Sequence, residues 1–135
     1  MSETKPSIKG VLLDTVNNEA KVVEFEPTLE NYYKLLHCDM IEYATRVIGP
    51  KGRGKQFDIV CDEEGTFKQD NKISAIDNIG NAMLVGSLLV VGPADDEGND
   101  TSLSDGDCEY VMERIQKMYT IKYPLGYLML TQCEY

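Results

Sequence analysis

Four cysteines and a single histidine are the residues of this chain whose types could support nucleophilic catalysis or metal binding. The cysteines lie 23, 47 and 25 positions apart, without the closely spaced C-x-x-C pairs of zinc sites and redox motifs. Adjacent residues on a helix point roughly 100° apart, so His37 does not face Cys38, and the chain has no G-x-S-x-G elbow. We therefore expect neither catalysis nor a metal site here. The four thiols, expected to be reduced, are Cys38, Cys61, Cys108 and Cys133.

The segment 49–56, GPKGRGKQ, resembles a phosphate-binding loop. It fits G-x-x-x-x-G-K through seven positions, but Gln56 stands where a magnesium-binding Ser or Thr is needed, and strand-like alternation follows in place of a helix. We therefore exclude nucleotide hydrolysis. The basic side chains of this loop are candidates for binding an anion or an acidic partner, with a solvated hairpin tip as the alternative. They are Lys51, Arg53 and Lys55.

A run of acidic residues extends from Gly92 to Glu113, with eight Asp or Glu and no Lys or Arg. The spacing around Gly98 and Gly106 does not fit a calcium-binding loop, so we expect no metal. Surface carboxylates can compete with a phosphate backbone for a basic groove, and the alternative is a solubilising loop. No carboxylate pair is placed for acid–base catalysis, so we expect no enzyme activity. The candidate partner-binding acids are Asp95, Asp96, Glu97 and Asp100.

Length and composition indicate one folded domain over residues 1–135. The chain has 13 Lys+Arg against 23 Asp+Glu, a net charge of −10 and a pI of about 4.5, so we expect no direct binding to duplex nucleic acid. The longest apolar stretch, 82–94, is interrupted by Gly and Pro and is too short to span a membrane. The first ten residues have no apolar signal core. We therefore expect no membrane association and a cytoplasmic location.

Hydrophobic periodicity predicts four strands and one helix in the first half of the chain. The first two strands form a hairpin around Asn17 and Asn18, residues that tolerate the left-handed conformation of a tight turn. Thr28 caps a helix over 28–37, in which apolar residues recur at helical spacing. The other two strands flank the basic loop. The four strands are expected at residues 7–13, 20–26, 41–47 and 57–61.

The second half adds two helices and two strands. A short helix is expected at 73–79, and the apolar run 83–91 predicts a central strand covered on both faces. Ser104 caps a helix over 105–119, and 127–130 forms a last strand. These elements predict a single α+β domain with a mixed, mostly antiparallel sheet of about five or six strands and two principal helices.

Half of the eight tyrosines fall in the final 17 residues. One interpretation is a strand packed on the core. The other is an aromatic contact surface or a strand that pairs with a partner chain, including a homodimer formed through this tail. Tyr123 and Tyr127 are the candidate partner-binding residues.

Two segments resemble a known family. IVCDEEG at 59–65 is similar to the family's I-V-C-N-E-E-G, and VGSLLVVG at 85–92 is similar to its V-G-T-F-L-I-V-G. The resemblance covers about residues 8–118 and leaves 119–135 as a tyrosine-rich C-terminal extension. The family is described as a domain of unknown function and is common on phages, plasmids and conjugative elements of Firmicutes. The resemblance implies a fold and a genetic context, but no catalytic residues and no cofactor.

Charge and resemblance together predict a non-enzymatic binding protein of a phage or mobile element. We expect it to inhibit a host defence protein by occupying its binding surface, with acidic mimicry of nucleic acid as the means. The alternatives are a sponge that binds a nucleotide signal and a structural accessory protein. The expected location is the cytoplasm of the bacterial host.

Overall fold

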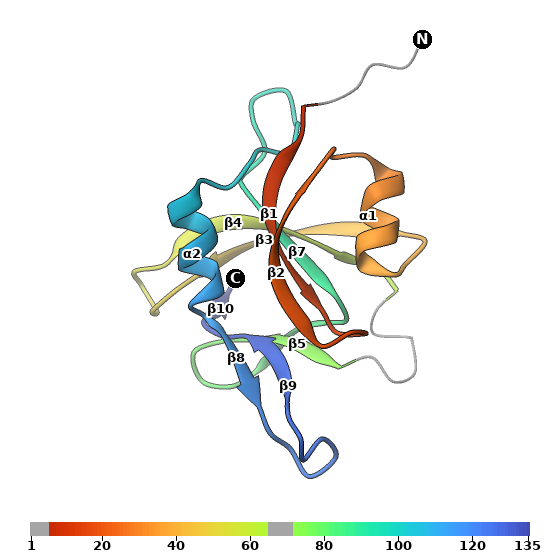
Figure 1. The fold of residues 1–135 in the computed structure, drawn as a ribbon. Coiled ribbons are helices and arrows are strands. Elements are labelled where there is room, and N and C mark those ends of the chain that lie inside the picture. The colour runs from red at the N-terminus through yellow and green to blue at the C-terminus, as the bar shows by residue number, and fades with distance from the viewer. Residues whose placement is uncertain (1–5, 65–71) are drawn as a thin grey trace.

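In the computed structural model, which describes residues 6–64 and 72–135, the strands form two sheets (Figure 1). The larger sheet is antiparallel throughout, in the order β10-β3-β4-β7-β1-β2. Its strands are β1 (Ile8–Asp14), β2 (Glu19–Phe25), β3 (Ile41–Ile48), β4 (Lys55–Asp62), β7 (Leu88–Val91) and β10 (Cys133–Glu134). The expected α+β class is confirmed.

A second, four-stranded sheet was not expected from the sequence. Its order is β6-β5-β9-β8, and the β5–β9 pair is parallel while the others are antiparallel. The strands are β5 (Ile73–Ile76), β6 (Ala82–Val85), β8 (Ile115–Met118) and β9 (Tyr127–Leu130). The tail therefore contributes one strand to each sheet, because β9 lies between β5 and β8, and β10 pairs with β3.

Strand β7 lies in the middle of the larger sheet, between β4 and β1, and all four of its residues are buried. Alternate side chains enter two separate cores, because successive residues of a strand point to opposite faces. Leu88 and Val90 pack in one core, Leu89 and Val91 in the other. Both faces of this sheet must therefore be covered.

Helix α1 (Leu29–Leu36) covers one face, where Tyr32 and Leu36 pack into the same core as Leu89. The Thr28 hydroxyl accepts the N–H of Asn31 at 3.3 Å, and His37 ends the helix in the left-handed conformation. The predicted cap and helix are confirmed.

Helix α2 (Asp105–Met112) and the second sheet cover the opposite face. The Ser104 hydroxyl accepts the N–H of Asp107 at 3.0 Å, which confirms the predicted cap. The prediction that the helix runs to residue 119 is wrong. The carbonyl of Arg114 accepts hydrogen bonds from the N–H and hydroxyl of Thr131, both at 2.8 Å, so the chain pairs with β9 instead of continuing the helix.

The predicted single strand over 83–91 is also wrong, because the chain turns at Gly86 (φ +84°) and Ser87 between the two sheets. The N–H of Gly86 donates to the backbone carbonyl of Lys72, and the Ser87 hydroxyl accepts a hydrogen bond from the N–H of Thr15 at 3.0 Å. Only Leu88–Val91 has the predicted position at the centre of a sheet.

The predicted helix over 73–79 is wrong as well. Residues Ile73–Ile76 form strand β5, and a turn follows in which the Asp77 carboxylate accepts the N–H groups of Ile79 and Asn81 at 3.0 and 2.8 Å. Pairing with β6 and β9 fixes this short apolar segment as a strand.

Because both faces of β7 are buried, we expect Leu88 and Leu89 to contribute equally to the stability of the fold. Leu88→Ala and Leu89→Ala should each lower the free energy of unfolding by about 2–5 kcal/mol, because each leaves a cavity in a different core. Val22→Ala, at a half-exposed position on β2, is the control and should change it by about 0.5 kcal/mol or less. Urea unfolding measures all three. A small effect for either leucine would mean that its face of the sheet is not covered.

Asp14 closes the β1–β2 hairpin. Its carboxylate accepts the N–H groups of Val16 and Asn17 at 2.9 and 3.0 Å, and its other oxygen lies 3.1 Å from Nε2 of His37. Burial raises the pKa of Asp14, but hydrogen bonds from the Asn17 backbone, from His37 and from the Asn17 side chain outweigh burial. The pKa of Asp14 is therefore below its ordinary value of 3.8.

Asp14→Asn should lower the free energy of unfolding at neutral pH by about 1 kcal/mol, because an amide accepts weaker hydrogen bonds than a carboxylate. A lowered folded-state pKa stabilises the protein above the unfolded-state pKa, and this contribution is lost as the pH falls through the folded-state value. Urea unfolding of both proteins between neutral pH and about pH 2.5 tests this. The difference between them should shrink below the ordinary pKa of 3.8, and a constant difference would contradict it.

Candidate functional site

The acidic loop between Pro93 and Asp100 has a defined shape. One oxygen of the Asp95 carboxylate accepts the N–H groups of Glu97 and Asn99, both at 2.9 Å. The N–H of Asp95 in turn donates to the carbonyl of Asn99 at 3.0 Å. The hydrogen bonds from Asn99 and Glu97 hold the pKa of Asp95 below its usual range. The charges of this loop are therefore held on an ordered turn.

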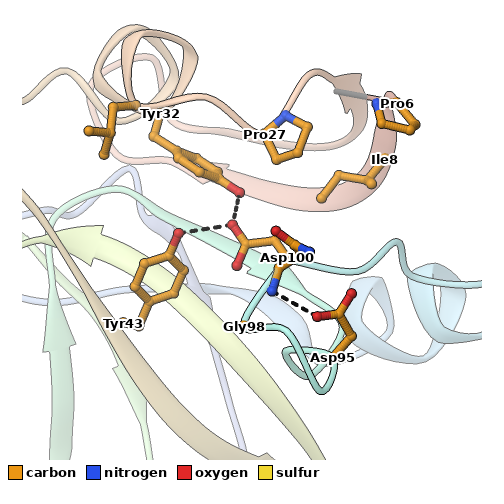
Figure 2. Close-up of a pocket in the computed structure, with 10 residues that line it drawn as sticks. Pro6, Ile8, Pro27, Tyr32, Tyr43, Asp95, Gly98 and Asp100 are labelled. Atoms are coloured by element: carbon orange, nitrogen blue, oxygen red, sulfur yellow. Dashed lines mark hydrogen bonds between the residues drawn. The ribbon is translucent and has the colours of Figure 1, made fainter. Parts of the chain in front are cut away.

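Asp100 points away from the loop apex toward the sheet. Its Oδ2 accepts hydrogen bonds from the hydroxyl of Tyr32 on α1 and, at 2.9 Å, from that of Tyr43 on β3 (Figure 2). The two rings pack edge to face with centroids 6.5 Å apart. This carboxylate joins the acidic loop, α1 and the larger sheet.

A cavity of about 520 Å³ lies beside these three residues. It is bounded by the start of β1, the turn into α1, strand β3 and the acidic loop (Figure 2). Its lining combines carboxylates and phenols with prolines and aliphatic side chains, and no described residue of the lining is Lys or Arg. The lining residues are Pro6, Ile8, Pro27, Leu29, Tyr32, Tyr43, Asp95, Gly98, Asn99 and Asp100.

The phenols in the cavity stay protonated at neutral pH. Burial, followed by the hydrogen bond to Asp100 and its negative charge, raises the pKa of Tyr32 and of Tyr43 far above the ordinary value of 10. Both hydroxyls therefore act as donors to Asp100, which remains available as an acceptor for an incoming group.

The four predicted acids are brought together, but in two roles. Asp95 and Asp100 line the cavity, whereas Asp96 and Glu97 are exposed at the apex and make no ion pair with a described residue. The acids farther along the chain differ. Asp105 lies 2.9 Å from Nζ of Lys9, and Asp107 lies 3.1 Å from Nζ of Lys55.

The three basic residues of the predicted loop do not all lie in a loop. Lys51 and Arg53 lie exposed in the turn between β3 and β4, but Lys55 belongs to β4. In addition to its ion pair with Asp107, its Nζ lies 5.3 Å from the ring centroid of Tyr110. None of the three basic residues lines the cavity.

The predicted tail tyrosines pack on each other. Tyr127 is 6% exposed, its ring lies 5.1 Å from that of Tyr123, and Nζ of Lys72 is 5.2 and 5.8 Å from the centroids of Tyr123 and Tyr127. The apolar side chains that project from the β8–β9 hairpin are other residues. They are Tyr119, Ile121 and Leu125.

Tyr32 and Tyr43 were not identified from the sequence as site residues. Helical spacing placed Tyr32 on a buried stripe, and alternation placed Tyr43 on a strand. A buried tyrosine hydroxyl requires a hydrogen-bond partner, so the burial predicted for Tyr32 was the one sign in the sequence that a polar group lies beside it. The partner, Asp100, lies 68 positions from Tyr32 and 57 from Tyr43.

The four cysteines are buried, and none forms a disulfide. Burial raises the pKa of the Cys61 thiol to about 12 and that of Cys133 to about 11, and it also raises the pKa of Cys108. These three thiols are therefore protonated at neutral pH and poor nucleophiles.

Two further observations apply to residues 6–64 and 72–135. They contain no cluster of three or more His, Cys, Asp or Glu side chains suited to a metal ion. Their helices are too short to cross a membrane.

A family model described as a domain of unknown function (DUF3846) matches residues 8–120 of the chain. The match includes α1, the acidic loop, α2 and β8, and thus every residue of the cavity from Ile8 onward. No curated protein and no solved structure matches the chain.

The Asp100 network predicts a change in tyrosine ionisation. Asp100→Asn should lower the pKa of Tyr43, because it removes the negative charge and the charged hydrogen-bond acceptor, while burial keeps the pKa above 10. Carbon-13 NMR of labelled tyrosine rings, followed with pH, measures this residue by residue. Asp96→Asn removes the same charge from the loop apex and should leave Tyr43 unchanged. Equal shifts in the two variants would contradict a direct interaction with Asp100.

Proposed function

We propose that this chain, which belongs to the DUF3846 family, is a non-enzymatic binding protein of a phage or other mobile element that occupies the nucleic-acid-binding surface of a host defence protein. It acts in the cytoplasm of the bacterial host. Its contact surface is the acidic loop together with the adjoining cavity.

The ordered acidic loop is the observation that carries this proposal. Asp96 and Glu97 are exposed on a turn whose backbone is held by Asp95. A preorganised row of carboxylates loses little conformational entropy on binding. Such a row can therefore compete with phosphates for a basic groove.

The distribution of neutralised acids supports the same surface. Lys9 and Lys55 pair with Asp105 and Asp107 in the first turn of α2. The acids of the loop before it form no ion pair with a described residue, so their charge remains available to a partner. The net charge of −10 would accelerate encounter with a basic partner.

Two observations support the non-enzymatic and host-directed parts of the proposal. The raised pKa values of Cys61, Cys108 and Cys133 disfavour thiolate chemistry. The motifs at 59–65 and 85–92 resemble those of the domain-of-unknown-function family, and we propose that this member belongs to a phage or conjugative element, where a small acidic protein that blocks a host factor has a use.

A sponge for nucleotide signals has less support. The cavity has two carboxylates and, in the part of the chain that the structure describes, no basic residue in its lining, which disfavours a phosphate. Lys55 of the basic loop is already paired with Asp107.

Native mass spectrometry of the tagged protein, recovered gently from its bacterial host, tests the proposal. We expect a stoichiometric complex with a host protein, and we expect the purified complex to have lost the ability of that host protein to bind nucleic acid. A bound molecule of a few hundred daltons in place of a protein would contradict the proposal.

Charge-reversed variants locate the contact. Asp96→Lys with Glu97→Lys should weaken the complex at least about tenfold, because like charges would then face each other. Glu63→Lys with Glu64→Lys is the matched control, since it reverses two consecutive exposed acids in another turn. Equal affinities of the two double variants would exclude the acidic loop as the contact.

A further inference from the structure

We infer that the cavity beside Asp100 binds an arginine side chain presented by the protein partner. The inference deepens the proposed function and rests on it for the identity of the partner. It concerns one anchoring position, whereas the exposed acids at the loop apex contribute general attraction.

The first argument is charge. Asp95 and Asp100 both line the cavity, and among residues 6–64 and 72–135 no Lys or Arg does. Both phenol hydrogen bonds end on Oδ2 of Asp100, so Oδ1 accepts none from another described residue. A cation that enters the cavity would meet a carboxylate whose Oδ2 is occupied by the phenols and whose Oδ1 accepts no hydrogen bond from the described part of the chain.

The second argument is the aromatic wall. Tyr43 is 50% exposed although its hydroxyl is fixed on Asp100, and the ring of Tyr32 stands edge-on to it, at 85° (Figure 2). A guanidinium group stacks on such a ring, and cation–π attraction acts within about 6 Å of the centroid. The fixed hydroxyl keeps the ring in place before binding.

The third argument is the apolar part of the lining. Pro6, Ile8 and Pro27 lie across the cavity from Asp95, and Leu29 is 58% exposed although it belongs to the apolar stripe of α1 (Figure 2). The three methylenes of an arginine stem can cover such surfaces while the charged end reaches a carboxylate. The volume of about 520 Å³ is in the range of small-ligand sites.

Arginine fits this combination better than lysine. Its planar guanidinium presents a fixed fork of donors to a carboxylate and stacks on an aromatic face, whereas an ammonium is a compact and strongly hydrated charge. Arginine is also the residue that basic proteins commonly use to contact phosphates, which connects this anchor to the proposed competition with nucleic acid.

An NMR titration of the isolated full chain with blocked amino acids tests the inference. The probe is N-acetyl-arginine methylamide, and the matched control probe is the citrulline derivative, which has nearly the same shape without the charge. We expect the arginine probe to shift the ring signals of Tyr32 and Tyr43 and to bind at least about tenfold more tightly than the citrulline probe. The lysine derivative should bind more weakly than the arginine probe. Equal binding of arginine and citrulline probes, or no shift at the two tyrosines, would overturn the inference.

Two variants and a control complete the test. Asp100→Asn keeps an oxygen to accept the phenol hydrogen bonds but removes the charge, and Tyr43→Leu removes the half-exposed ring; each should weaken arginine binding about tenfold. Asp96→Asn makes the same charge change outside the cavity lining and should have little effect. If Asp96→Asn weakens binding as much as Asp100→Asn, the attraction is general and the anchor is refuted.

The probe titration needs no partner, so its outcome is independent of the host complex. Arginine binding in the cavity without a captured host protein would refute the proposed function and leave the site standing. A host complex whose affinity is unchanged by Asp100→Asn and Tyr43→Leu would refute the anchor and leave the function standing.

Discussion

Burial of both faces of strand β7 is the constraint on which the rest of the structure depends. Leu88 and Val90 point to one core, and Leu89 and Val91 to the other. A sheet with such a strand at its centre exposes apolar surface to water unless each face is covered, and removing apolar surface from water stabilises a fold by roughly 25 cal/mol per Å². The two helices and the second sheet supply these covers.

The two covers differ in extent, and this difference creates the candidate site. On one face, α2 and the four-stranded sheet pack over the core that contains Val11, Ile59 and Leu130. On the other face, α1 packs near the middle of the sheet, and Tyr43 on β3 remains half exposed beside it. The acidic loop folds toward this position and fixes it through Asp100, and the cavity lies beside them.

Features that depend on local chain chemistry could be predicted from the sequence. The β1–β2 hairpin, the helix capped by Thr28 and the cap at Ser104 each follow from neighbouring residues, and the structure confirms them. Residues 115–118 could not be assigned in this way. Their apolar residues suit a helix, but the backbone pairs with strand β9, with Ile115 opposite Leu130, and the segment is therefore a strand. The prediction of a single strand over 83–91 was wrong for the same reason. The turn at Gly86 is required only because the segments before and after it belong to different sheets.

The sequence by itself determined the acidity of the chain, the position of the acidic loop and the local elements on either side of it. Only the tertiary structure decided which carboxylates are neutralised by Lys9 and Lys55, which remain exposed, and which one turns inward to Tyr32 and Tyr43. Composition and periodicity report the local preference of each residue, whereas these contacts join positions dozens of residues apart. Such contacts exist only in the folded arrangement, in which the loop lies beside α1 and β3.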